Sequence, residues 1–253
     1  MQLARTLGIL RSLALYYGVP FRLSRRRELY KALVPPDGLC FDVGAHVGNH
    51  LHCFRSIGAR VVALEPQPDF AWILRRLYGS DPGVTILDAA VGAEPGEARL
   101  LASVRTPTVT SLNPQWVQQV GATLGFEHVS WIRGPTVPVT TLDALVARHG
   151  IPDFVKIDVE GMEPAVLSGL SLALPALSFE FLPAAKDHAA ACIDRLASLG
   201  EYRYNWSFGE TSRFASTVWV EANRAREWLA GLKAGADSGD LYARAANQPA
   251  LRP

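Results

Sequence analysis

The chain has 253 residues, 49% of them hydrophobic and 19% charged, which is enough to bury one sizeable core in a single domain with appendages. Its formal net charge is +1, so it has no overall positive field to gather a nucleic acid, and we expect no nucleic-acid partner. Its three cysteines, at positions 40, 53 and 192, lack C-x-x-C spacing, which indicates neither a disulfide framework nor a thiolate zinc site and fits a reducing cytoplasm.

Residues 1–36 are predicted to form a helical extension. Residues 2–17 carry apolar side chains at helical spacing, and a second helical stretch contains Arg25–Arg27 and runs to Lys31. The apolar run at residues 7–15 is too short and too interrupted to span a membrane, and no small-residue cleavage site follows it. We therefore expect no transmembrane segment, no signal peptide and a cytoplasmic protein. The extension packs on the main domain or on a partner or, as an alternative, makes a weak contact with an anionic membrane surface.

From residue 37 to residue 221 apolar strands alternate with helical stretches, a pattern typical of a parallel sheet covered on both faces. We expect strands at residues 39–43, 60–64, 84–87, 154–157 and 177–181, followed by two more at residues 202–208 and 216–220. Residues 89–103 are expected to form a hairpin-like excursion. Residues 106–138, which are rich in proline and contain three aromatic side chains, are predicted to be a substrate lid. Residues 222–253 are predicted to be a helix and a poorly ordered tail.

The turn after the first strand predicts a nucleoside-binding site. Residues 41–48, FDVGAHVG, lead from a strand through glycines into a helix, where backbone N–H groups are exposed and a ligand can approach the main chain. The second strand delivers a carboxylate that is spaced to accept the hydroxyls of a ribose. An acidic residue at the end of the first strand would repel a pyrophosphate but attract an ammonium or sulfonium, which favours S-adenosylmethionine over NAD. The predicted cofactor-binding residues of this region are Asp42, Gly44, Ala45, His46, Gly48 and Glu65.

A second acidic turn makes the prediction more specific. Residues 153–163, DFVKIDVEGME, are a short apolar strand that ends in an acidic, glycine-containing turn. Together with DVGAHVG, ALEP and TLD, this stretch resembles the FkbM family of S-adenosylmethionine-dependent methyltransferases, over residues 37–183. The resemblance implies a Rossmann-like class I methyltransferase fold, an α/β fold with a seven-stranded, mostly parallel sheet and helices on both faces. It also implies adenine contacts from Asp88 and Ala89, and an oxygen nucleophile. His46 departs from the family pattern, which usually has asparagine there.

The predicted catalytic residues are carboxylates at strand ends. Asp158 directly follows a buried strand and can hold the ammonium of the cofactor, act as a general base or bind a metal. Glu160 is a further candidate, with capping of the next helix as its alternative. Glu180 lies between two phenylalanines, which would raise its pKa unless it pairs with Lys156 or an arginine. Asp158 and Glu180 are also the ligands that a Mg²⁺ ion would use, if one is bound.

The sequence thus predicts a methyltransferase that uses S-adenosylmethionine to methylate a hydroxyl on a sugar or another small metabolite. Two alternatives remain open from the residues alone. One is an NAD-dependent oxidoreductase on a similar fold, which the missing middle glycine disfavours. The other is a nucleoside-binding module that has lost its chemistry. Neither the acceptor nor the oligomeric state follows from the sequence.

Overall fold

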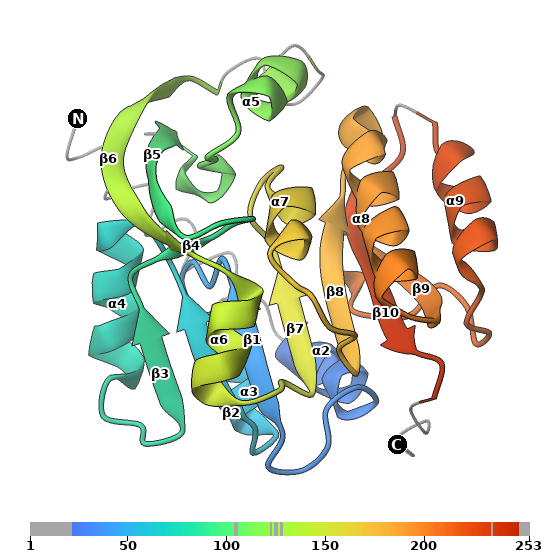
Figure 1. Cartoon of the computed structure of the whole chain (residues 1–253), viewed down its shortest axis with the longest axis horizontal. Coiled ribbons are helices and arrows are strands. Elements are labelled where there is room, and N and C mark those ends of the chain that lie inside the picture. Colours follow the sequence, from blue (N-terminus) through green and yellow to red (C-terminus); the bar gives the residue numbers. More distant parts are fainter. Residues whose placement is uncertain are drawn as a thin grey trace.

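The fold is an α/β sandwich built on a seven-stranded sheet (Figure 1). The computed structural model describes residues 22–103, 106–121, 123, 126, 129–233 and 235–247. The strand order is β3-β2-β1-β7-β8-β10-β9, and β10 alone runs against its neighbours. The strands of this sheet are β1 (Leu39–Val43), β2 (Arg60–Leu64), β3 (Val84–Leu87), β7 (Phe154–Ile157), β8 (Ala176–Phe181), β9 (Tyr202–Phe208) and β10 (Gly239–Ala245). This is the Rossmann-like sheet that the sequence predicts.

Helices cover both faces of the sheet because its central strands are apolar on both sides. In β1 all five residues are buried, with Phe41 and Val43 facing one core and Cys40 facing the other. The first face carries α6 (Leu142–His149), α7 (Glu163–Ser168), α8 (Lys186–Leu199) and α9 (Ala222–Ala230), and the second carries α2 (Arg22–Lys31), α3 (Asn49–Ser56) and α4 (Pro68–Tyr78). None of the helices in the described part of the chain is long and apolar enough to span a lipid bilayer.

A smaller sheet stands above the carboxyl ends of β1 and β2, in the upper part of Figure 1. It consists of β4 (Ala90–Val91), β6 (Trp131–Thr140) and β5 (Gly96–Ser103), in that order. The chain between β5 and β6 contains a short 3-10 turn, η1 (Pro107–Val109), and α5 (Pro114–Gly121). Much of the predicted lid is therefore built into this sheet through β6, and its closing motion stays a prediction. Two further 3-10 turns are η2 (Pro183–Ala185) and η3 (Gly209–Thr211).

The last strand of the large sheet differs from the prediction. Residues 216–220 form no strand, and Val220 makes only an isolated bridge with Tyr204. The seventh strand is β10, which lies between β8 and β9 and has both edges paired, so the sheet needs chain well beyond residue 221. Alanine and glycine have low strand propensity, which made this segment resemble a tail, but burial between two neighbouring strands outweighs that propensity. The expected helix at residues 2–17 and the end of the tail lie outside the described residues.

The tight pairing of β9 with β10 predicts a stability effect at Gly239. A Cβ atom there would overlap the carbonyl oxygen of Ser207 on β9, whereas a Cβ at Gly235 would meet nothing within 4 Å. We expect Gly239→Ala to lower the free energy of unfolding by about 2 kcal/mol, because overpacking forces the two strands apart. Gly235→Ala is the matched control and should change it by less than about 0.5 kcal/mol. Urea denaturation of both variants tests this, and equal stabilities would contradict the pairing.

Candidate active site

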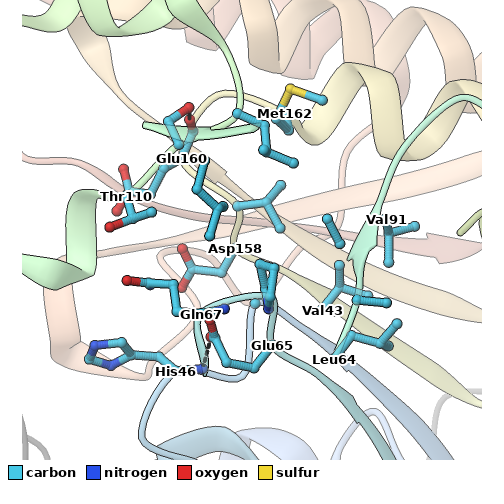
Figure 2. A pocket seen from close by; sticks show the side chains of 18 of the residues that line it. Val43, His46, Leu64, Glu65, Gln67, Val91, Thr110, Asp158, Glu160 and Met162 are labelled. Carbon is cyan, nitrogen blue, oxygen red and sulfur yellow. Dashed lines mark hydrogen bonds between the residues drawn. The ribbon is translucent and has the colours of Figure 1, made fainter. Parts of the chain in front are cut away.

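A pocket of about 570 Å³, part of it open to solvent, lies where the strand order reverses beside β1. Ligands of open α/β sheets bind at this position, because the loops after neighbouring strands diverge there. We call it the switch-point pocket, and Figure 2 shows the side chains around it. Its wall consists of Val43, Gly44, His46, Leu64, Glu65, Pro66, Gln67, Ala89, Ala90, Val91, Leu100, Thr108, Thr110, Ser111, Leu112, Asp158, Val159, Glu160 and Met162.

The turn after β1 packs directly on the turn after β7. Gly44 has φ 86°, and a Cβ atom there would overlap the carbonyl oxygen of Asp158. Gly44 lines the pocket as predicted, but this contact means that its missing side chain serves the packing of the two turns as well as a ligand. His46 and Gly48 also have positive φ values, 49° and 82°, and α3 begins directly after Gly48. Glycine adopts such φ values at no steric cost, which suits the two glycine positions of this turn.

Glu65 lies at the end of β2 with its carboxylate anchored by the backbone. Its Oε2 accepts the His46 N–H at 2.7 Å and its Oε1 accepts the Gln67 N–H at 2.8 Å. Each carboxylate oxygen keeps a further lone pair for a ligand hydroxyl. The side chain is 2% exposed, and this burial raises the pKa of Glu65 to about 7 against the opposing effect of the two N–H donors. The geometry suits recognition of a ribose.

Four of the predicted cofactor residues do not line the pocket. Asp42 precedes the pocket-lining Val43 on β1 and therefore points to the other face of the sheet, where it accepts a hydrogen bond from the Leu51 N–H and ties α3 to the sheet. Burial raises the pKa of Asp42 to about 7, against the lowering effect of nearby Lys156. Ala45 is buried and donates its N–H to the Leu64 carbonyl. Gly48 occupies the N-terminal cap position of α3.

The fourth of these residues is Asp88, which is half exposed and does not line the pocket. Its carboxylate pairs with the Arg75 guanidinium of α4 at 2.6 Å, whereas the neighbouring Ala89 does line the pocket. His46 also lines the pocket, and its ring packs on Phe70 with centroids 4.0 Å apart. Burial lowers the pKa of His46 to about 3, so this ring is neutral at physiological pH.

The three predicted catalytic carboxylates come together. Asp158, Glu160 and Glu180 each place an oxygen within 4.8 Å of the others. We call these residues the acidic cluster. Burial raises the pKa of Glu160 and of Glu180 well above the usual range, and repulsion from neighbouring carboxylates raises both further. The cluster therefore holds protons near neutrality or binds a cation. Lys156 bonds to Asp158 and Asp240, at 3.2 and 2.8 Å, rather than forming the alternative salt bridge to Glu180.

The turn that carries the cluster depends on supports that the sequence analysis missed. Glu160 and Gly161 both have positive φ, 51° and 92°. The Glu163 carboxylate accepts the N–H groups of Val159 and Gly161, at 3.2 and 3.1 Å. Across the turn, Ser111 Oγ donates to the Glu160 carbonyl at 2.6 Å. Asn113 Nδ2 likewise donates to the Gly161 carbonyl at 2.9 Å. An acid six residues after the end of the strand was the available signal for Glu163, but nothing local marks residues 111–113.

Comparison with known proteins decides the family. A protein-family model described as "Methyltransferase FkbM domain" matches residues 42–235, about three quarters of the chain. The chain belongs to the FkbM methyltransferase family. This assignment confirms the family that the sequence predicts.

More distant similarities extend to one curated protein and to solved structures. The FkbM chain is 30% identical over 145 residues to the hexuronic acid methyltransferase AglP of Haloferax volcanii, covering 56% of this chain and 54% of that protein. It thus spans about half the length of that relative. Among solved structures, it is similar to a precorrin-6y C5,15-methyltransferase from Geobacter metallireducens (TM-score 0.44, 13% identity, 88% and 87% of the two chains). It is also similar to an O-methyltransferase from Bacillus cereus solved with SAH (TM-score 0.44, 10% identity, 94% and 90%). The similarities to these two solved structures carry no argument about the ligand.

The raised pKa of Glu65 predicts that cofactor affinity depends on pH. As the pH falls through about 7, this carboxyl takes up a proton and one of its oxygens becomes a donor rather than an acceptor. We expect the affinity for S-adenosylhomocysteine to rise about tenfold between pH 6 and pH 8, as the ionised fraction of a group with this pKa does. Isothermal titration calorimetry measures it. The Glu65→Gln variant should bind S-adenosylhomocysteine more weakly, and its affinity should not rise between pH 6 and pH 8. A tenfold rise in the variant would mean that another group causes the pH dependence.

Proposed function

We propose that this FkbM-family chain transfers the methyl group of S-adenosylmethionine to a hydroxyl oxygen of a small acceptor. The observation that carries the proposal is the acidic cluster, because it brings three carboxylates together and two of them, Asp158 and Glu160, line the pocket that suits the cofactor. A hydroxyl group is a weak nucleophile until a base takes its proton. Carboxylates beside the reacting oxygen supply that base.

The residues of the switch-point pocket fit the cofactor. Glu65 would hold the ribose hydroxyls, since both of its oxygens are fixed by backbone N–H groups and keep lone pairs for a ligand. Apolar side chains that line the pocket, such as Val91 and Leu100, provide surfaces for a planar base. Asp158 would attract the positive charge of the amino acid moiety or the sulfonium. When bound, S-adenosylmethionine supplies an electrophilic methyl group.

The acidic cluster can act on the acceptor in one of two ways. In the first, the hydroxyl oxygen would form its bond to the methyl carbon as the bond from that carbon to sulfur breaks and S-adenosylhomocysteine leaves. The proton of the hydroxyl would pass to the ionised member of the cluster, and protons on the remaining carboxyls would limit their repulsion. In the second, a divalent cation such as Mg²⁺ binds the carboxylates and lowers the pKa of the hydroxyl directly. We propose the first, because Lys156 already offsets part of the charge of Asp158 at 3.2 Å.

A sugar hydroxyl is the first acceptor class to test, since the curated relative is named for methylation of a hexuronic acid. The predicted cytoplasmic location and the absence of a nucleic-acid partner remain parts of this proposal. The net charge of +1 supports a small-molecule acceptor rather than a polyanion.

Substitutions should separate the roles of cofactor pocket and cluster. Glu65→Ala is expected to weaken S-adenosylhomocysteine binding by about 1.5–3 kcal/mol, because the ribose loses a charged acceptor. Asp158→Asn should lower kcat by about 10²–10⁴-fold, with a smaller loss of cofactor affinity, because the reacting hydroxyl loses a base. Asp88→Asn is the control, because Asp88 pairs with Arg75 and does not line the pocket. This variant should retain the wild-type kcat and the wild-type affinity for S-adenosylhomocysteine. Wild-type turnover in Asp158→Asn would remove the cluster from the chemistry.

Chelation distinguishes the two ways of activating the hydroxyl. We expect methyl transfer to continue in excess EDTA, since a carboxylate base needs no metal. The rate of S-adenosylhomocysteine release, measured with and without EDTA and added Mg²⁺, tests this. Loss of activity in EDTA and its return with Mg²⁺ would replace the base with a metal site at the same three carboxylates.

A further inference from the structure

A second cavity lies beside the switch-point pocket, and we call it the polar pocket. It has a volume of about 520 Å³, part of it open to solvent, and lies between α2, η3 and β10. Its wall is made largely of polar and charged side chains from segments distant in sequence. They include Arg26, Tyr30, Lys156, Glu180, Glu210 and Asp240.

The acidic cluster forms the boundary between the two cavities. Glu160 lines the switch-point pocket, Glu180 lines the polar pocket, and Asp158 lines both. A molecule in the polar pocket can therefore present a group to Asp158 while the cofactor occupies the other side. A methyl transfer requires this arrangement, because donor and acceptor must meet at one point with water excluded.

We propose that the polar pocket is the acceptor site, and that it selects a neutral, hydroxyl-rich molecule such as a sugar or polyol without a carboxylate or phosphate on the bound unit. This inference rests on the proposed function and adds the site and the charge of the acceptor to it.

The preference for hydroxyl groups follows from the polar atoms of the wall. Tyr30 Oη and His50 Nδ1 lie 2.6 Å apart, and Tyr242 Oη donates to Asp240 Oδ2 at 3.3 Å. With the carboxylate of Glu180 and the side chain of Ser238, the wall offers donors and acceptors in several directions. A polyol satisfies both kinds of group, since each of its hydroxyls donates one hydrogen bond and accepts others.

The preference for a neutral molecule follows from the ion pairs. Among the described residues that line the polar pocket, both permanent cations already have carboxylate partners. Arg26 Nη2 bonds to Glu210 Oε2 at 2.6 Å, and Lys156 Nζ bonds to Asp240 Oδ1 at 2.8 Å. Their side chains are only 5% and 1% exposed.

The wall therefore has no spare positive charge for an anion. Its described acidic residues are Asp158, Glu180, Glu210 and Asp240, against the two cations. An anionic acceptor would have to break a buried pair and face the remaining carboxylates, which costs more than a neutral hydroxyl does. A neutral acceptor leaves every pair intact.

The test compares matched neutral and anionic probes. We would measure kcat/KM for 4-nitrophenyl β-D-glucoside against the glucuronide, and for the galactoside against the galacturonide, from S-adenosylhomocysteine release. The wild-type protein is expected to prefer each neutral glycoside by about tenfold or more, the factor that corresponds to 1.4 kcal/mol. Preference for the uronides, or no methylation of any probe by protein that binds S-adenosylhomocysteine, would overturn the inference.

Two variants locate the preference in the polar pocket. Glu210→Gln frees Arg26 to meet an anion, so the neutral-to-anionic ratio should fall at least threefold. Glu227→Gln, which removes the exposed partner of Arg224 on α9, is the matched control and should leave the ratio unchanged. Ser238→Leu should raise the acceptor KM at least tenfold with unchanged S-adenosylhomocysteine affinity, whereas Thr217→Leu, outside the pocket, should not.

The outcomes also separate this inference from the proposed function. A ratio unaffected by Glu210→Gln, or an acceptor KM unaffected by Ser238→Leu, would overturn the polar pocket as the acceptor site while methyl transfer stands. Failure of the wild-type protein to bind S-adenosylhomocysteine would overturn both.

Discussion

The close packing of two turns, one after β1 and one after β7, is the constraint on which the rest of the site depends. Gly44 leaves no room for a side chain because the Asp158 carbonyl occupies that space. This contact brings the turn after β1, which lines the switch-point pocket, against the turn that carries the acidic cluster. Glu65 then fixes the first turn through the His46 N–H, and Glu163 fixes the second through the N–H groups of Val159 and Gly161. Backbone donors and buried carboxylates thus set the geometry of both sides.

The same arrangement concentrates carboxyl groups in a small volume, and the chain limits their repulsion in distinct ways. Backbone N–H groups bond to Glu65 and Glu163, and Lys156 lies between Asp158 and Asp240. Burial still raises the pKa of Glu65 and of Glu163 to about 7. Such raised pKa values are typical of groups that exchange protons near neutrality, and they occur here beside a cavity. Structural support and chemical function therefore use the same residue type.

The sequence predicts most of the fold because buried parallel strands are short apolar runs bounded by glycine, proline and acidic residues. It predicts Glu65 and Asp158 for the same reason, since a residue that follows a strand reaches the carboxyl edge. Asp42 lies one residue too early, so the alternation of strand side chains turns it to the opposite face. β10 was missed because burial between two strands, rather than propensity, determines it. The polar pocket could not be predicted, since Arg26 and Glu210 meet only through tertiary packing.

The central claim is that the two pockets meet at Asp158, with the cofactor in one and the acceptor in the other. The most direct measurement is a crystal structure of the chain with S-adenosylhomocysteine. This account predicts that the ribose hydroxyls bond to Glu65, that the thioether sulfur lies beside the acidic cluster and that the polar pocket stays open to an acceptor. S-adenosylhomocysteine bound in the polar pocket, or with its ribose away from Glu65, would contradict it.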